Sequence, residues 1–535
     1  MRKQTKLVAV LSASALLAIG ASMTALADTP HWDQEDGEWV YLDRNGDKVT
    51  DEWKKSNGQW YYLDSDGYMA KDMVIEDDDD KYYVDENGAR VTNAWVSMDN
   101  DDLLDDEDSM ESIDTVWMYF DGNGKAVGCD TTNGEIKKLS YGDGQSGYFI
   151  FNEDGYMLSG WQKWDKNGNN NSLYYLGTQN EGWARTGWAY LEIDPDIDAF
   201  SGIDEDDYDE DEYWFYFKSS GKAVKNDTRS VGGKTYVFDE FGIMLDLWVY
   251  KDASGSNTYT NLDPASSSAA GSAYYAEDNG GRDKNWIYAY PKSNYDDYDD
   301  DPYWFYLDSN GKPFIADENS SKVFKTGSAV RIDDDDVTDA TDAEYNGVVA
   351  AKSIKSETYL FNDKGVMLSG LYWLGSTVEG EDDAPVYKGT SETALTPGYY
   401  YFTTADGSTE GQMQTNKRIK IDIEDEDEEK TYYFNKQGRA YTNCVINGYV
   451  YGWDGRMVDS YGDGSTYERV ALSSITQGAD LTDKSGKVLV EYSDDIYVLV
   501  NENGKIRKSG TTSSDVNDQK VTVNNYIVTS VEDDD

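Results

Sequence analysis

Residues Gly58–Met73 read GQWYYLDSDGYMAKDM, an aromatic triplet followed by an acid and a turn glycine. Residues 37–52 read GEWVYLDRNGDKVTDE and residues 81–94 read KYYVDENGARVTNA, so the same phrase stands on both sides. The step between the three copies is 21 residues, measured between their turn glycines Gly46, Gly67 and Gly88. A fixed step of this length predicts a repeat protein built from one small folding unit.

Aligning the chain on this glycine extends the repeat almost to the last residues. The aligned glycines are Gly46, Gly67, Gly88, Gly124, Gly155, Gly221, Gly242, Gly311, Gly365, Gly407, Gly438, Gly455 and Gly504, with a degenerate copy at Gly280. The residue four places before the glycine (position −4) is bulky and apolar or aromatic in every copy except Thr403, and position −6 is mostly Tyr or Phe. These two positions share one face of a strand, so we expect them to form the core.

The opposite face of the strand, at positions −5 and −7, is aromatic too. It carries the pairs Trp39/Tyr41, Trp60/Tyr62, Trp117/Tyr119, Trp214/Tyr216 and Trp304/Tyr306. The Asp, Asn and Gly residues that follow favour a tight turn, and a short returning strand comes after it. Each unit is therefore predicted to be a β-hairpin. Because one hairpin is only marginally stable, we expect an all-β solenoid of stacked hairpins.

Residues 1–27 have the pattern of a secretory signal peptide. A basic start is followed by the apolar run Leu7–Ile19 and by the cleavage sequence Ala25-Leu26-Ala27. No later apolar run is long enough to span a bilayer. We therefore expect a secreted protein without a membrane span.

The charge of the chain limits its partners. Its 47 Lys and Arg against 104 Asp and Glu give a formal net charge of −57. Such a surface repels nucleic acid and favours cations, divalent metals and neutral sugars. The two cysteines, Cys129 and Cys444, are far apart in sequence, so the fold cannot depend on a disulfide framework.

Three later copies carry a family resemblance together with the opening phrase. They are YFIFNEDGYMLSGW (148–161), YVFDEFGIMLDLW (236–248) and YLFNDKGVMLSGL (359–371). This pattern resembles the cell-wall-binding (choline-binding) repeat family of Gram-positive surface proteins, and it is similar to glucan-binding repeats and to the receptor-binding repeats of clostridial toxins. The resemblance implies a β-hairpin solenoid in which aromatic cages between hairpins hold choline of teichoic acid, or offer platforms for sugars. Cation–π attraction suits a quaternary ammonium.

The resemblance also implies which residues make cages: the tryptophan after the turn, and aromatics at −7 or −5 of adjacent strands. Packing between hairpins is the alternative role for each ring, and copies with a non-aromatic −7, such as Lys81 and Thr235, lack a complete cage. The expected cages are Trp53 with Trp60 and Tyr83, Trp161 with Tyr174 and Trp183, and Trp188 with Trp214 and Tyr216.

Acidic runs separate many of the hairpins. One interpretation is that they are solvated loops, and the other is that their carboxylates bind calcium. No EF-hand spacing supports calcium, and we expect no other cofactor. The runs are Glu76–Asp80, Asp99–Asp108, Ile203–Glu212, Tyr295–Asp301, Asp333–Asp336 and Asp422–Glu429.

No enzyme is expected. The chain has one histidine, His31, so a histidine-dependent triad or zinc site is nearly excluded. No stretch free of repeats is long enough to hold a catalytic domain.

The sequence thus predicts a secreted, non-catalytic protein associated with the cell wall, which binds choline-bearing teichoic acid or glycan. A lectin-like adhesin for host or dietary glycans and a metal-dependent surface-matrix protein are the alternatives, and no protein partner is indicated. The predicted organisation is a signal peptide (1–27), hairpin repeats (28–250), an irregular insert with a degenerate repeat (251–300), further repeats (301–469) and a terminal β cap (470–535).

Overall fold

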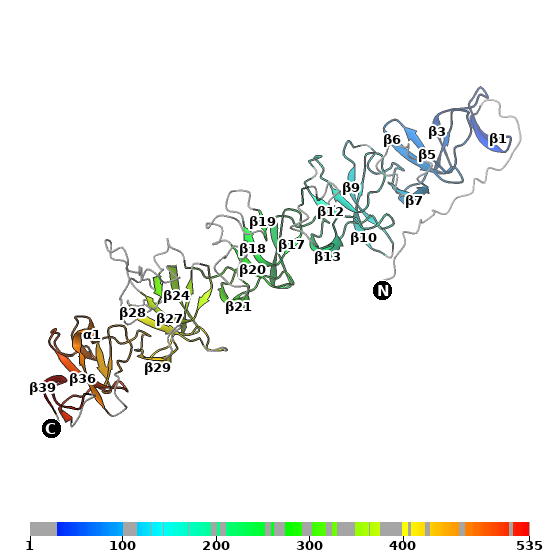
Figure 1. Cartoon of the computed structure of the whole chain (residues 1–535). Helices are drawn as coiled ribbons and strands as arrows, with labels where there is room; N and C mark the ends of the chain where they lie inside the picture. Colours follow the sequence, from blue (N-terminus) through cyan, green and yellow to red (C-terminus); the bar gives the residue numbers. More distant parts are fainter. Residues whose placement is uncertain are drawn as a thin grey trace. The chain divides into compact units, whose positions relative to one another are not determined.

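The structure is a computed structural model (Figure 1). It describes residues 29–99, 115–129, 131–142, 144–169, 171–193, 200, 202–203, 210–251, 258–261, 273–290, 302–316, 324–328, 348–362, 364–374, 398–404, 408–422, 429–459, 466–512 and 517–533. The predicted signal peptide lies outside these residues. Two compact units divide the chain: one holds Met1–Asp246, Ser254–Asn261 and Asp278–Gly281, and the other holds Leu247–Ala253, Leu262–Glu277 and Arg282–Asp535.

The first unit is built from antiparallel hairpins that follow one another along the chain. They are β1 (His31–Glu35) with β2 (Glu38–Leu42), β3 (Glu52–Ser56) with β4 (Gln59–Leu63), β5 (Met73–Asp77) with β6 (Asp80–Val84), β7 (Ala94–Asp99) with β8 (Thr115–Phe120), β9 (Glu135–Ser140) with β10 (Ser146–Phe151), β11 (Trp161–Lys163) with β12 (Leu173–Tyr175), β13 (Gly187–Glu192) with β14 (Glu212–Phe217), and β15 (Asp227–Val231) with β16 (Lys234–Phe238) and β17 (Met244–Leu245). Strand β19 (Tyr259–Thr260) also belongs to this unit.

The second unit begins with the pairs β18 (Leu247–Lys251) with β20 (Tyr274–Ala276) and β21 (Asn285–Ala289) with β22 (Tyr303–Leu307). A six-stranded sheet then joins two hairpins in the order β26-β25-β24-β23-β27-β28. Its strands are β23 (Phe324–Ser328), β24 (Val348–Ile354), β25 (Glu357–Asn362), β26 (Met367–Leu368), β27 (Gly370–Leu374) and β28 (Gly398–Phe402), and the pair β29 (Arg418–Ile421) with β30 (Lys430–Tyr433) follows.

The last part of this unit mixes short strands with one helix. Its elements are β31 (Cys444–Ile446), β32 (Tyr449–Tyr451), β33 (Tyr467–Ala471), α1 (Leu472–Thr476), β34 (Leu481–Asp483), β35 (Val488–Val490), β36 (Tyr497–Asn501), β37 (Gly510–Thr512), β38 (Gln519–Asn524) and β39 (Ile527–Asp533). The all-β hairpin solenoid predicted from the sequence is confirmed.

Burial alternates along each hairpin strand as the sequence predicts. In β4, Tyr61 at −6 and Leu63 at −4 are 2% and 0% exposed, whereas Trp60 and Tyr62 are only half-buried. The same order recurs in β14 and β22, whereas in β16 Val237 at −5 is buried and Tyr236 at −6 is half-buried. The side chains at −4 and −6 therefore form the core, and those at −5 and −7 are available to contact another surface.

An acid or amide at position −3 organises the turn. The Asp85 carboxylate accepts hydrogen bonds from the backbone N–H groups of Asn87 and Ala89, both at 2.9 Å. This is the side-chain turn that Asp and Asn favour. The same pair of bonds recurs at Asp43, Asp64, Asp121, Asn152, Asp239, Asp308, Asn362 and Asn435.

A backbone hydrogen bond joins many of the hairpins to the one before. The N–H of Met69, two places after its turn glycine (position +2), donates to the carbonyl of Trp39 at −7 of the previous hairpin, at 2.8 Å. The equivalent bond runs from Met457 to Thr431 at 2.7 Å. Because only backbone atoms take part, position −7 can be Trp, Lys or Thr without breaking the stack.

Close packing around the turn also requires glycine at this position. Gly88 has φ +77°, which favours glycine, and an added Cβ would lie 2.9 Å from the Met69 sulfur. The +2 side chain of one copy therefore lies against the turn glycine of the next.

One predicted repeat position is wrong. The sequence aligned the copy near residue 400 on Gly407, with Thr403 at −4. In the structure, Phe402 is the fully buried −4 residue and pairs with Met413, and Gly411 (φ +69°) packs on Met367 as the turn glycine. The turn is five residues longer than the standard one, so a fixed offset misplaces it; Gly407 itself lies outside the described residues.

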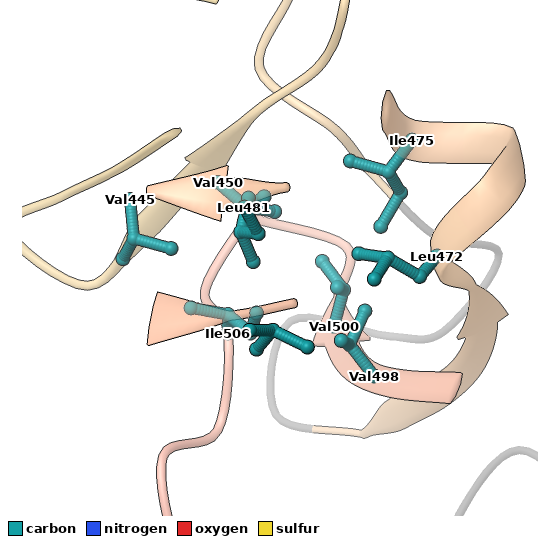
Figure 2. Close-up of a cluster of buried hydrophobic side chains, with 9 residues drawn as sticks. Val445, Val450, Leu472, Ile475, Leu481, Val498, Val500 and Ile506 are labelled. Atoms are coloured by element: carbon teal, nitrogen blue, oxygen red, sulfur yellow. The ribbon is translucent and has the colours of Figure 1, made fainter. Parts of the chain in front are cut away.

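The C-terminal part has an aliphatic core in place of the aromatic one. Figure 2 shows its side chains converging from strands and from α1, which the sequence did not predict. Within the described part of the chain α1 is the one helix, and its five residues are too few to cross a membrane. The cluster comprises Val445, Val450, Leu472, Ile475, Leu481, Val490, Val498, Val500 and Ile506.

The predicted domain boundaries stay predictions. The predicted insert, residues 251–300, contains β20 and β21 among its described residues, so ordered strands continue through it.

The turn acid yields a stability prediction. Replacing Asp85 by Ala should lower the local unfolding free energy by about 1–3 kcal/mol, because the N–H groups of Asn87 and Ala89 lose their acceptor. Asp85→Asn keeps an acceptor, as Asn152 and Asn435 do naturally, and should cost much less. Native-state hydrogen exchange at the two amides measures the difference, and equal protection in both variants would contradict the role given to the turn acid.

Candidate functional site

Aromatic side chains gather where one hairpin faces the next. Each such cage has four parts: a tryptophan on the first strand, a tryptophan at −7 of the second strand, an aromatic ring at −6 of the next hairpin, and the +2 side chain of that next hairpin. The first-strand tryptophan lies directly opposite the −5 tyrosine in the hairpin register. This pairing turns the indole toward the next hairpin, because −5 and −7 share that face.

The first complete cage, the Trp188 cage, lies between hairpins β13–β14 and β15–β16. The rings of Trp188 and Trp214 stand at 88° with centroids 6.1 Å apart. Tyr236 of the next hairpin lies 4.6 Å from Trp188. Trp214 remains 44% exposed, so one wall of the cage faces solvent. Met244 stands at the +2 position, paired with Phe238 in the sheet.

The second complete cage, the Trp286 cage, repeats this geometry in the other unit. Trp286 and Trp304 stand at 89° with centroids 6.2 Å apart, and Tyr359 lies 4.7 Å from Trp286. Met367 at +2 packs in the same cluster. Two independent copies with the same angles show that the local sequence, and not chance packing, sets the arrangement.

A carboxylate lies beside the second cage. The Trp304 indole N–H donates to the carboxylate of Glu410 at 3.0 Å. The negative charge of this group and the faces of the indoles both favour a cation.

The Trp32 cage has the same four parts near the start of the described chain. Trp32, Trp39 and Tyr61 pack in one cluster with Met69, and the Trp32 and Tyr61 centroids are 5.5 Å apart. Burial raises the pKa of Tyr61, so its ring stays neutral at physiological pH.

The predicted cage of Trp53, Trp60 and Tyr83 needs one correction. Trp53 and Trp60 do line the same cage, but the third ring of that cage is Tyr82, 5.3 Å from Trp53. Tyr83, at −5, turns to the following hairpin, where it lies 6.1 Å from Phe120. The prediction took −5 where −6 was needed, because it is the −6 ring that faces the preceding hairpin.

The +2 residue of this Trp53 cage is Arg90. Its guanidinium lies 5.2 Å from the Trp53 ring, 5.4 Å from the Trp60 ring and 5.3 Å from the Tyr82 ring. The space that other cages line with methionine therefore already contains a cation.

The predicted cage of Trp161, Tyr174 and Trp183 does not exist as a group. Trp161 packs on Phe215 and on other rings of its cluster. Tyr174 is 1% exposed in a different core cluster. Trp183 stacks on Tyr141 at 4.3 Å. These tryptophans fill spaces between hairpins, the alternative role considered from the sequence.

A related set around Trp95 is closed in the same way. Trp95, Trp117, Phe149 and Met157 occupy the four cage positions, but Trp117 is only 7% exposed and the Tyr141–Trp183 stack packs against the same cluster. A ligand therefore has no access to the Trp117 ring comparable with its access to Trp214.

The prediction of Trp188, Trp214 and Tyr216 grouped residues that the structure does bring together, since Trp188 and Tyr216 lie 5.1 Å apart. It missed Tyr236, Met244 and the whole Trp286 cage. A signal was present: YWFY occurs at 213–216 and again at 303–306, each preceded by a W-x-Y strand and followed by a +2 methionine in the next hairpin.

A further cavity of the described chain is lined by none of the cage residues. A cavity of about 580 Å³ in the second unit is lined mainly by charged side chains, including Arg418, Lys420, Lys505, Glu429 and Asp459, with no tryptophan. Within the described ranges no three His, Cys, Asp or Glu side chains gather as metal ligands. Most acidic runs fall outside those ranges, so calcium binding stays a prediction.

Comparison with known proteins agrees with the repeat geometry. Residues 49–95, which span β3 to β6, match the family model of the choline-binding repeat. No curated protein matches the chain. Three similar solved structures come from Streptococcus pneumoniae. They are the modular autolysin LytC in complex with a synthetic peptidoglycan ligand (19% identity, 56% of this chain and 54% of that chain, TM-score 0.28), the choline-binding domain of CbpL (21%, 47% and 96%, 0.28) and choline-binding protein F (16%, 81% and 99%, 0.22).

The chain thus spans about half the length of LytC, and at these identities and TM-scores the solved structures do not bear on its own ligand or activity. The family model that matches residues 49–95 is the model of the choline-binding repeat. Residues 49–95 therefore match the choline-binding repeat, and the predicted resemblance to the choline-binding repeat family is confirmed.

Proposed function

We propose that this chain is a secreted, non-catalytic protein of the cell wall, and that it binds choline groups of a wall polymer in its Trp188, Trp286 and Trp32 cages. The observation that carries the proposal is the pair of indoles at right angles, closed by a −6 tyrosine and a +2 methionine, which occurs with the same distances in both units.

The physical basis is cation–π attraction. A trimethylammonium group has no hydrogen-bond donor and spreads its charge over methyl groups, so aromatic faces solvate it well. Each such contact contributes about 0.5–2 kcal/mol, more as water is excluded. Two perpendicular indoles and a tyrosine offer three faces to one group, and the methionine supplies a polarizable apolar floor.

The lining of the cages favours a cation over a sugar. A polyol needs several hydrogen-bond partners, but the Trp304 indole N–H is already engaged by Glu410. The high negative charge of the chain also draws cations toward its surface. Binding of uncharged glycan, or assembly through metal ions, remains an alternative outcome of the tests below.

The cysteines and the histidine support a non-catalytic role. Burial raises the pKa of Cys129 to about 11 and that of Cys444 to about 12, so both thiols stay protonated and unreactive at neutral pH. His31 is exposed, and its ring nitrogen is within hydrogen-bond distance of the Thr29 carbonyl.

The cages predict the effect of removing single indoles. Trp214→Ala and Trp304→Ala should each weaken choline binding at one site about tenfold, which corresponds to the loss of one strong cation–π contact. The double variant should be eluted from immobilised choline by a much lower concentration of free choline. Calorimetric titration of the full chain measures the number and affinity of the sites.

Trp164→Ala is the matched control, because Trp164 donates its indole N–H to the Asn133 carbonyl and belongs to no cage. It should leave choline binding unchanged. If the native chain is not retained on choline but binds uncharged glycans, the adhesin alternative replaces the proposal. If retention requires calcium and is abolished by EDTA, the metal-dependent alternative does.

Two tryptophans of one cage should differ in their effect on stability. Trp188→Ala should lower the local unfolding free energy by about 2–4 kcal/mol, because Trp188 packs on Tyr216, Tyr236 and Phe238. Trp214→Ala should cost less than about 1 kcal/mol, since this ring is 44% exposed. Hydrogen exchange of β13–β16 separates the two, and a larger loss from Trp214→Ala would invert the assignment of structural and binding rings.

The absence of catalysis is tested with purified cell walls. Incubation with the full chain should release no new reducing ends, free amines or soluble fragments, while the chain itself sediments with the walls. Release of wall fragments above a heat-denatured control would show an enzyme.

A further inference from the structure

Arg90 occupies a position that the other cages give to methionine. Its backbone pairs with Val84 as Met69 pairs with Leu63, and its N–H donates to the carbonyl of Trp60 at 2.9 Å. The side chain is thus delivered to the Trp53 cage by the same backbone geometry that delivers Met69 to the Trp32 cage. Arginine in place of methionine at this position changes the side chain inside the cage, while the aromatic residues that form its walls stay the same.

The guanidinium is held by rings. Its carbon lies within 5.2–5.4 Å of the ring centroids of Trp53, Trp60 and Tyr82. It forms no ion pair with any described residue, and its Nε is buried without a hydrogen-bond partner among them. Behind it stands Gly124, where an added Cβ would lie 2.9 Å from Nε. Three aromatic faces therefore replace the carboxylate that a half-buried arginine ordinarily finds.

We propose that Arg90 is the resident cation of the Trp53 cage and closes it to choline, so that among the Trp32, Trp53, Trp188 and Trp286 cages the +2 residue decides whether a cage is open, with methionine, or filled, with arginine. This inference rests on the proposed function of the open cages. It makes Arg90 a specificity-determining residue: the Trp53 cage contributes to the stability of the stack and not to ligand binding.

Covalent attachment gives the internal cation its advantage. An external choline would have to displace a guanidinium that is always present at the rings, and tethered groups act at high effective concentration. Burial lowers the pKa of Arg90, yet an arginine keeps its proton at neutral pH.

Other basic residues at +2 do not share this setting. Arg282, two places after Gly280, lies 3.9 Å from the Tyr274 ring centroid, and its guanidinium lies over no indole of the described residues. Arg282→Met therefore provides a matched control: the same substitution at the same repeat position, without indole walls.

The first test counts choline sites. The full chain, Arg90→Met and Arg282→Met are titrated with choline chloride in a calorimeter. Arg90→Met should bind one more choline per chain than the native protein. Arg282→Met should bind the native number. An unchanged number of sites in Arg90→Met, with hydrogen exchange of β3–β6 as in the native chain, would overturn the proposal.

The second test needs no ligand. In the full chain labelled with ¹⁵N-arginine, the Arg90 side-chain Nε–Hε resonance is assigned by its loss in Arg90→Lys. Ring currents should shift it upfield of the other arginines, and Trp60→Leu should return it part of the way. A resonance at the ordinary position would overturn the proposal.

The two tests also separate this inference from the proposed function. Saturating choline should leave the Arg90 resonance in place while the open cages fill, and its movement to the ordinary position would show a displaceable guanidinium and contradict the closure. If the native chain and Arg90→Met both bind no choline, the proposed function fails and so does the specificity role, whereas an upfield Arg90 resonance would still establish the occupied cage.

Discussion

The structure depends on one constraint: the two faces of each hairpin strand must meet different neighbours. Positions −4 and −6 face the preceding hairpin, and positions −5 and −7 face the following one. In many hairpin pairs, including those of the Trp32 and Trp53 cages, a bond from the +2 N–H to the −7 carbonyl fixes the spacing with backbone atoms alone. Each cage forms where two hairpins stack, because its walls come from the −7 face of one hairpin and the −6 face of the next.

This division lets side chains vary without loss of the stack. Lys81 and Thr431 stand at −7, and the hairpins there still carry the inter-hairpin bond. The turn glycine has less freedom, since the +2 side chain of the preceding copy lies against it. Binding residues can therefore be gained and lost one cage at a time. The filled Trp53 cage and the closed Trp95 set are two outcomes of such change within one unit.

Charge and aromatic surface act together in this chain. With 104 acidic against 47 basic residues, its surface concentrates cations, but carboxylates in water hold them loosely. The indole pairs provide the sites at which a weakly hydrated cation loses water. Arg90 shows the same preference inside the molecule: among many available carboxylates, its guanidinium lies over three rings.

The sequence by itself determined the repeat, the hairpin, the core face and the family resemblance, because a period of two along a strand and a turn glycine are local properties, readable in Tyr61, Leu63 and Gly67. It did not determine which rings share a cage. The structure has Tyr82 in the cage for which the sequence predicted Tyr83, and it places Trp161 and Trp183 in different clusters. A cage joins residues of two hairpins, and the neighbour that each strand face meets is settled only when the hairpins stack. Insertions also shifted the repeat, as at Gly411. Only the tertiary structure could show that the Arg90 guanidinium occupies the Trp53 cage. Its position there depends on distances between side chains of three strands and a turn.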